Sequence, residues 1–296
     1  MFRIIMRQFL DLTKSGIVVF VLVTGAAGFA LSWRPYEAFD FAHLFMTLVS
    51  LYFFSSGSFA LNQAQEWRLD REMPRTSKRP IPSGKISVFQ ATFLGIAFVL
   101  IGFLSGVLVN FNVAMLGLAT VLLYNLCYTL YWKRKWTFGA VPGAIPGAMP
   151  VVIGYAANAD HLFHPEVIHA FLLMFLWQMP HFWSLAIKFK DDYAAGKVPV
   201  LPVMLGTEKT LFHIGLYMFA YVAVAIASPW FTSAYFVYAF IVVPFAFKVL
   251  WEFFRYYRAG GQSHWLSFFL WTNFSMLIFL IAPVLDKWQR FYSGNV

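Results

Sequence analysis

Nine long apolar runs constrain this chain more than any other feature of its sequence. Each run is close to the ~20 residues that a helix needs to cross about 30 Å of hydrocarbon. None alternates apolar and polar residues with a period of two, so a β-barrel is disfavoured and α-helices remain. We therefore predict an all-α polytopic membrane protein with about nine transmembrane helices. The runs cover about 15–33, 40–61, 88–109, 113–132, 139–157, 167–187, 211–228, 233–254 and 267–285.

The composition of the chain supports this class. Its 296 residues are 60% hydrophobic and 12% charged, with a mean hydropathy of +0.66. A soluble globular domain has about 45–50% apolar and about 25% charged residues, so this chain is too apolar for one. The single cysteine, Cys127, lies inside a predicted span, which excludes a disulfide framework and a cysteine-based metal site.

The distribution of positive charge predicts an orientation in the membrane. With the N-terminus in the cytoplasm, only Arg34, Lys287 and Arg290 of the 22 lysines and arginines fall outside. The net charge of +9 then follows from topology, so no nucleic-acid partner is needed to explain it. The short N-terminal tail is unlike a transit peptide, which favours a bacterial inner membrane. We predict a cytoplasmic N-terminus and an external C-terminus.

Two long polar segments, 62–87 and 188–209, fall on the predicted cytoplasmic side. Each ends in a Pro-rich stretch that contains glycine, and corresponding positions such as Asn62 and His181 lie about 120 residues apart. This spacing indicates a duplicated four-helix unit followed by a ninth helix. We expect the two polar ends to meet at one central cavity, within a single transmembrane domain of residues 1–296.

The stretch NQAQEWRLDREMPRTSKRP, residues 62–80, has the composition of a diphosphate site. Asn62, Glu66 and Asp70 are four residues apart, so on a helix they share one face. Two carboxylates and an amide oxygen suit Mg²⁺, which binds few carboxylates together with substrate phosphates. The alternative is a solvated loop whose arginines only follow the charge rule for inner loops. The basic residues that follow, suited to phosphate oxygens, are Arg71, Arg75, Lys78 and Arg79.

The same stretch closely resembles the first signature of the intramembrane (UbiA-type) prenyltransferase superfamily, N-x-x-x-D-x-x-x-D followed by R-T-x-x-R-P. Two later stretches, YTLYWKR and LWQMPHFWSLAIKFKDDYAAGKVPVLPV, resemble the branch of this family that makes heme O from protoheme IX. The resemblance extends over about 55–210. It implies nine helices around a central cavity that is open to the cytoplasmic side and to lipid.

The resemblance also implies a reaction: Mg²⁺-dependent transfer of a farnesyl group from farnesyl diphosphate to a vinyl group of protoheme IX. The vinyl group attacks the allylic cation, water completes a hydroxyethylfarnesyl side chain, and heme is a substrate. Asn62, Glu66 and Asp70 are then metal ligands and catalytic residues, and Tyr128 lies near the cation. The implied substrate-binding residues are Arg71, Arg75, Lys78, Arg79, Lys133, His181, Lys188 and Asp191. Further implied partners are membrane lipid, heme A synthase and oxidase assembly factors.

The sequence departs from the family pattern and leaves alternatives open. Glu66 stands where the family usually has Asp, and Arg68 stands where it often has another acid. His181 is a cavity residue or a structural one, and Trp177, Phe182 and Trp183 are interpreted as helix packing or cavity wall rather than reactive groups. Tyr128 and Lys133 equally fit an interfacial Tyr and a Lys that reaches the membrane surface.

Two other functions compete with heme prenylation. One is a sibling prenyltransferase that acts on a quinone precursor or another lipid acceptor. The other is a transporter, which is disfavoured because the polar clusters gather at one membrane face rather than at its middle. The run GAVPGAIPGAMP, with small residues and prolines every four positions, is interpreted as close helix packing rather than chemistry.

Overall fold

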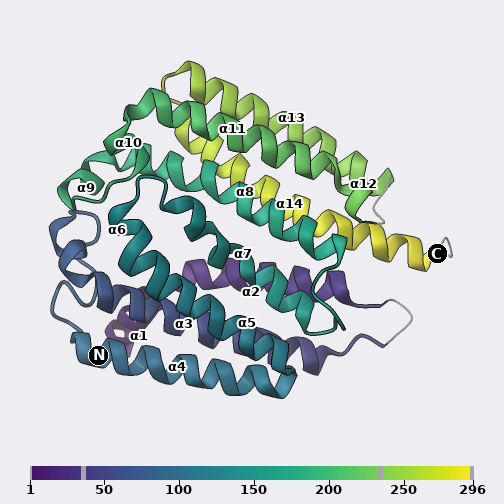
Figure 1. Cartoon of the computed structure of the whole chain (residues 1–296), viewed down its shortest axis with the longest axis horizontal. Coiled ribbons are helices and arrows are strands. Elements are labelled where there is room, and N and C mark those ends of the chain that lie inside the picture. Colours follow the sequence, from purple (N-terminus) through teal and green to yellow (C-terminus); the bar gives the residue numbers. More distant parts are fainter. Residues whose placement is uncertain (1, 35–37, 233–235, 294–296) are drawn as a thin grey trace.

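The computed structural model of the chain describes residues 2–34, 38–232 and 236–293, in which the regular elements are helices and no strand occurs. Eight helical segments are long and apolar enough to cross a membrane. Figure 1 shows the long helices running side by side. The eight segments are α2 (Ser15–Ser32), α3 (Phe41–Glu72), α4 (Val88–Val109), the continuous stretch Phe111–Lys135, α8 (Pro165–Lys188), α11 (Gly206–Ile226), α13 (Phe236–Arg258) and α14 (Trp265–Tyr292). The all-α membrane class is confirmed.

The remaining predicted span, 139–157, forms helix α7 (Ala140–Ala156). It has 17 residues, which gives about 25 Å at about 1.5 Å per residue, the lower end of what crosses the hydrocarbon. Every predicted run therefore coincides with a helix over its described residues, and eight of these helices have full spanning length. The start of the run 233–254, residues 233–235, lies outside the described residues. The helix contains Pro146 and Pro150 yet continues through both of them.

Helix α7 packs closely on α2 directly after the run GAVPGAIPGAMP, residues 139–150. A Cβ atom added at Gly154 would lie 1.9 Å from the carbonyl oxygen of Gly25, and one added at Gly28 would lie 2.0 Å from that of Val151. Only glycine permits backbones to approach this closely. These contacts lie just beyond the run. Within it, Ala144 and Ala148 are buried in the largest apolar cluster, as expected for helix packing, whereas Gly143 and Gly147 face Tyr128 and Gln178 of the cavity described below.

Large apolar side chains cover much of the outer surface. Phe89, Phe163 and Phe240 are 79%, 88% and 84% exposed. In water such a surface would be an aggregation liability, whereas in lipid it is the expected contact face. The largest buried apolar cluster lies instead between α7, α8, α11, α13 and α14.

Helix α3 continues past its predicted apolar run and ends only at Glu72. Its last turns, the connection after it, and the short helices α9 (Lys190–Ala195) and α10 (Leu201–Met204) lie at one end of the molecule (Figure 1). The two polar segments meet there, since Arg75 Nε lies 3.6 Å from Asp192 Oδ2. Their meeting was expected, while the duplication of the four-helix unit stays a prediction.

Three further elements complete the fold. The amphipathic helix α1 (Phe2–Leu12) precedes α2, and Lys14 joins the two with a left-handed backbone (φ 50°). The segment Phe111–Lys135 comprises α5 (Phe111–Leu122), the π-helix η1 (Leu123–Trp132) and α6 (Lys133–Lys135). The short helix α12 (Ser228–Phe231) follows α11.

Candidate functional site

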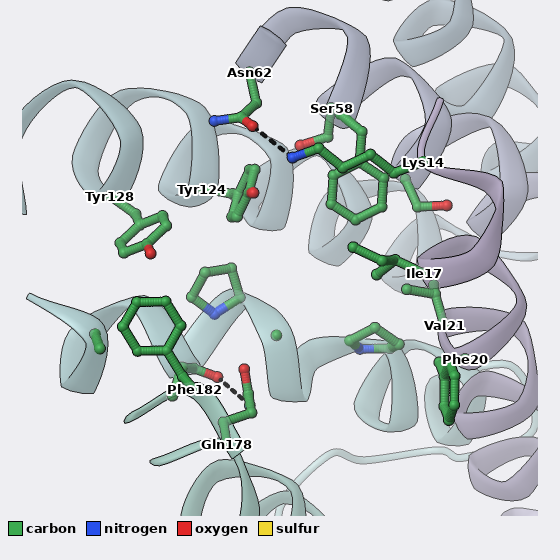
Figure 2. Close-up of a pocket in the computed structure, with 18 of the residues that line it drawn as sticks. Lys14, Ile17, Phe20, Val21, Ser58, Asn62, Tyr124, Tyr128, Gln178 and Phe182 are labelled. Carbon is green, nitrogen blue, oxygen red and sulfur yellow. Dashed lines mark hydrogen bonds between the residues drawn. The ribbon is translucent and has the colours of Figure 1, made fainter. Parts of the chain in front are cut away.

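A cavity of about 430 Å³ lies between α2, α3, η1, α7 and α8. Figure 2 shows Tyr124 and Tyr128 on one side of it, facing Gln178 and Phe182 on the other. One end is charged and the rest is lined mainly by apolar and aromatic side chains. The charged end is formed by Lys14, Asn62, Glu66, Asp70, Arg75, Arg79 and Lys133.

The predicted acidic face of α3 lines the charged end of the cavity. Asn62, Glu66 and Asp70 are 1%, 3% and 2% exposed. The side-chain amide of Asn62 donates to Glu66 Oε2 at 3.0 Å and to Thr129 Oγ1 at 3.1 Å. The spacing of four residues therefore places all three side chains on one buried face, as the sequence predicted.

Each carboxylate of this face forms an ion pair inside the cavity. Lys133 Nζ lies 2.7 Å from Glu66 Oε2, and Arg79 Nη1 lies 2.7 Å from Asp70 Oδ2. The side chain of Thr76 donates to the backbone oxygen of Asp70 at 2.8 Å, which folds the following turn back so that Arg79 reaches the acid. The arginine and threonine of the R-T-x-x-R-P stretch thus have structural reasons for their positions.

Lys14 belongs to the site, although the sequence analysis counted it only as a topological charge. Its Nζ donates to Asn62 Oδ1 at 2.8 Å (Figure 2) and lies 5.2 Å from the centre of the Phe59 ring. Burial lowers the pKa of Lys14 to about 7, and the charges of Arg79 and Lys133 act in the same direction. A bound anion would favour the charged form. A lysine directly before an apolar run also fits the charge rule for inner segments, so no local pattern distinguishes it as a site residue.

The donor atoms on α3 fit Mg²⁺ bound together with a diphosphate. Glu66 Oε1 is buried without a hydrogen-bond partner among the described residues, so it is free to act as a ligand. Within the same residues no group of three or more His, Cys, Asp or Glu side chains is placed to hold a metal. Two carboxylates and an amide oxygen are an incomplete set, which phosphate oxygens and water would complete.

The π-helix η1 forms the aromatic wall beside the charged end. In a π-helix the backbone bonds join residues five apart, and such segments occur often at functional sites. The hydroxyl of Thr129 donates to the carbonyl oxygen of Tyr124 at 2.9 Å. The rings of Tyr124 and Tyr128 lie 5.5 Å apart, and both line the cavity. Tyr128 is therefore a cavity residue rather than an interfacial one.

His181 of α8 lines the cavity from the opposite side. Its ring lies between those of Trp177 and Phe269, with centroid distances of 4.8 Å to each. Its Nδ1 is buried and has no hydrogen-bond partner in the described part of the chain. Trp183 is fully buried and packs, while Trp177 and Phe182 are part of the cavity wall, the two alternatives that the sequence offered for these residues.

Four residues suggested by the sequence lie away from the cavity lining. Arg71 directly follows Asp70 on α3 and so points to another side of the helix, where it is exposed, and Lys78 is exposed in the following turn. Lys188 is exposed, with its Nζ 5.5 Å from the Trp265 ring. Asp191 is also exposed. The acid of α9 that faces Arg75 is its neighbour, Asp192.

Comparison with known proteins places the chain in a family. The profile of the UbiA prenyltransferase family matches residues 17–273. A protein from Bdellovibrio bacteriovorus is 53% identical over 96% of this chain and 97% of its own length. One from Leptospira biflexa is 36% identical over 95% and 99% of the two chains. Both relatives bear the name protoheme IX farnesyltransferase.

Solved structures show the same fold. A structure concerning digeranylgeranylglyceryl phosphate synthase superposes with a TM-score of 0.77 at 15% identity, covering 96% of this chain and 99% of that one. A UbiA homolog from Archaeoglobus fulgidus, bound to GPP and Mg²⁺, gives a TM-score of 0.67 at 18% identity, over 93% and 99% of the chains. At such low identity the likeness concerns the arrangement of helices alone.

Proposed function

The chain belongs to the UbiA prenyltransferase family, and on that basis we propose that it transfers the farnesyl group of farnesyl diphosphate to a vinyl group of protoheme IX. The products are heme O and diphosphate. The relative that is 53% identical over nearly the whole chain carries this proposal. We propose that residues 1–296 form one catalytic domain, and the family match over residues 17–273 supports this.

The charged end of the cavity would hold the donor headgroup. Three basic side chains converge on it: Lys14 from the junction of α1 and α2, Arg79 from the turn after α3, and Lys133 from α6. Donors fixed around a leaving diphosphate stabilise the negative charge that grows on it as the allylic C–O bond breaks. When diphosphate arrives, Lys133 and Arg79 can exchange their carboxylate partners for phosphate oxygens.

Asn62, Glu66 and Asp70 would hold Mg²⁺ at the same end. Bound there, Mg²⁺ would neutralise charge on the departing diphosphate. The oxygen atoms of this face are buried and lie opposite the basic residues, so the donor is oriented with its phosphates toward α3. The farnesyl chain would extend into the apolar remainder of the cavity.

The aromatic wall would serve the cation and the acceptor. Tyr124 and Tyr128 line the cavity next to the charged end, and the face of an aromatic ring attracts a cation. His181 and Trp177 line it from α8. We assign His181 to acceptor binding because its buried Nδ1 has no partner in the described structure and adjoins the cavity.

A product assay tests this function. Purified protein is incubated with Mg²⁺, farnesyl diphosphate and heme, and the products are identified by mass spectrometry. Hydroxyethylfarnesyl heme is the expected product. Prenylation of a quinone precursor with no heme product would instead identify a sibling of the heme branch, and absence of any prenyl product would contradict the proposal.

Replacing His181 by Ala should impair the use of heme more than the ionisation of the donor. The reason is that the charged end, which binds the donor, is formed by other residues. Product formation with heme and hydrolysis of farnesyl diphosphate without an acceptor are measured side by side. Equal losses in the two assays would assign His181 to the donor site, and no loss in either would return it to a structural role.

The chain is an integral membrane protein, and we propose that it lies in a bacterial inner membrane with a cytoplasmic N-terminus and an external C-terminus. Single cysteines replacing Lys85 and His161, in a Cys127→Ser background, test the orientation. Both positions are exposed, Lys85 in the connection before α4 and His161 in the connection before α8, and the proposed topology puts them on opposite sides of the membrane. A membrane-impermeant thiol reagent added to intact cells should label position 161 and spare position 85. The reverse pattern would invert the topology and move the site to the outside.

The product, a membrane-bound heme, also needs an acceptor protein. We propose that the chain associates with heme A synthase or with oxidase assembly factors, since these would use its product. Co-purification from membranes after mild crosslinking tests the association. Failure to recover either protein, with the enzyme itself recovered intact, would count against it.

A further inference from the structure

Gln178 presents a fixed hydrogen-bond acceptor to the cavity. Its side-chain nitrogen donates two hydrogen bonds, to the carbonyl oxygens of Ala144 and Met174, each at 3.0 Å. Both amide hydrogens are therefore used, and the orientation of the amide is settled because both partners can only accept. Its oxygen, Oε1, receives no hydrogen bond from the described residues, and the side chain lines the cavity (Figure 2).

Helix α7 is shaped to receive this amide. A Cβ atom added at Gly147 would lie 2.0 Å from Gln178 Oε1 and 2.8 Å from its Cδ. Any larger residue would therefore displace the amide from its position. The glycine that the sequence analysis assigned to helix packing leaves the space for a polar side chain of the cavity.

The acceptor lies one helical turn beyond Tyr128. A Cβ atom added at Gly143 would lie 2.4 Å from the ring of Tyr128. Residues four apart on a helix are about 5–6 Å from each other, so Tyr128 and Gln178 occupy adjacent places along α7. Gly139, directly before α7, lies against the backbone of Trp132, the neighbour of Lys133, so α7 starts near the charged end. Tyr128 is therefore nearer that end and Gln178 is deeper.

We propose that Gln178 Oε1 accepts a hydrogen bond from the water molecule that becomes the hydroxyl group of the product. The inference rests on the function proposed above. The terminal vinyl carbon bonds to C1 of the farnesyl group as the C–O bond to diphosphate breaks, which leaves a cation on the vinyl carbon attached to the porphyrin. A lone pair of the water forms a C–O bond to that carbon, and its proton passes to the released diphosphate.

The position and chemistry of the amide suit this step. The carbon that water attacks is one bond beyond the carbon that joins C1, so it lies on the side of C1 away from the diphosphate, toward Gln178. An amide is neutral, so it orients water without forming an ion pair with the cation. The hydroxyls of Thr24, Ser55 and Thr120, which also line the cavity, each donate to a carbonyl oxygen of their own helix.

Replacing Gln178 by Met tests the role through the identity of the product. Met has a similar length and no strong acceptor, so water would no longer be held beside the cation. The cation should then lose a proton from the neighbouring carbon, giving an alkene that is one water lighter than the hydroxylated product. We expect the ratio of alkene to hydroxylated heme to rise at least about tenfold, a difference of about 1.4 kcal/mol between the two barriers.

Two glycine variants provide an independent test. Gly147→Ala should raise the same ratio, because its methyl group displaces the Gln178 amide. Gly143→Ala displaces Tyr128 instead, so it should slow the reaction with the wild-type ratio of products. An unchanged ratio in both Gln178→Met and Gly147→Ala, with hydroxylated product still formed by wild type, would overturn the role of Gln178 while leaving the proposed function intact. Absence of any farnesylated heme from wild type would instead contradict the proposed function.

Discussion

Replacing Asp70 by Asn, or Glu66 by Gln, is expected to lower turnover by about 10²–10³-fold, a loss typical when one group that stabilises transition-state charge is removed. Both side chains keep their size, and both lie at the cavity, so the change removes charge rather than packing. The partners left behind, Arg79 and Lys133, are 27% and 22% exposed and retain access to water. The protein should therefore remain inserted and folded. Farnesyl transfer is measured alongside thermal unfolding in detergent.

The controls for this prediction use the same part of the chain. Asp191→Asn alters an exposed acid outside the cavity lining and should leave turnover close to wild type. Glu66→Asp restores the residue usual in the family and should retain activity. Full activity of both Asp70→Asn and Glu66→Gln, or full activity in excess EDTA, would contradict the assignment of Mg²⁺ to this face.

Replacing Lys133 by Met should lower kcat/KM for farnesyl diphosphate by about 10²-fold. A charge-assisted hydrogen bond to a desolvated partner contributes about 1.5–3 kcal/mol, and a tenfold change in rate corresponds to about 1.36 kcal/mol. Lys133 Nζ already lies in the cavity, 2.7 Å from Glu66, where a phosphate oxygen could replace the carboxylate. Initial rates at varied donor concentration separate the loss of binding from the loss of turnover.

Lys188→Met is the matched control, because Lys188 is exposed and lies over Trp265 rather than in the cavity. It should change kcat/KM by less than Lys133→Met in the same assay. If the two variants lose equal activity, the effect is a general loss of positive charge at this face of the membrane. If Lys133→Met keeps wild-type kcat/KM, Lys133 only balances the charge of Glu66.

The fold and the acidic face of α3 were predictable because both follow from regular periodicities in the sequence. Apolar runs of spanning length fix helices in lipid, and each predicted run coincides with a helix. The spacing of Asn62, Glu66 and Asp70 needs only a continuing helix to form a face, and α3 does continue to Glu72. The predicted span 139–157 likewise differs from α7 by one residue at each end.

The remaining residues of the site depend on contacts between segments that are distant in the sequence. Lys14 enters it through a left-handed turn between α1 and α2 that no local pattern marks. The choice between Asp191 and Asp192 depends on how α9 lies against Arg75. Gln178 gains its role from Gly147 on another helix. The sequence contained each of these residues, but their chemistry appears only when the helices are placed together.

The ion pairs of the cavity would make its two proposed ligands, Mg²⁺ and diphosphate, thermodynamically dependent on each other. Glu66 and Asp70 already have cationic partners in Lys133 and Arg79. A divalent cation alone would therefore compete with Lys133 and Arg79 for the two carboxylates. Diphosphate alone would compete with the two carboxylates for Lys133 and Arg79. A metal–diphosphate complex would replace both ion pairs at once, because the metal would pair with the carboxylates and the phosphates with the two basic side chains. Each ligand would thus raise the affinity for the other by the same factor, and we expect the cavity to select the metal–diphosphate complex over either free ion.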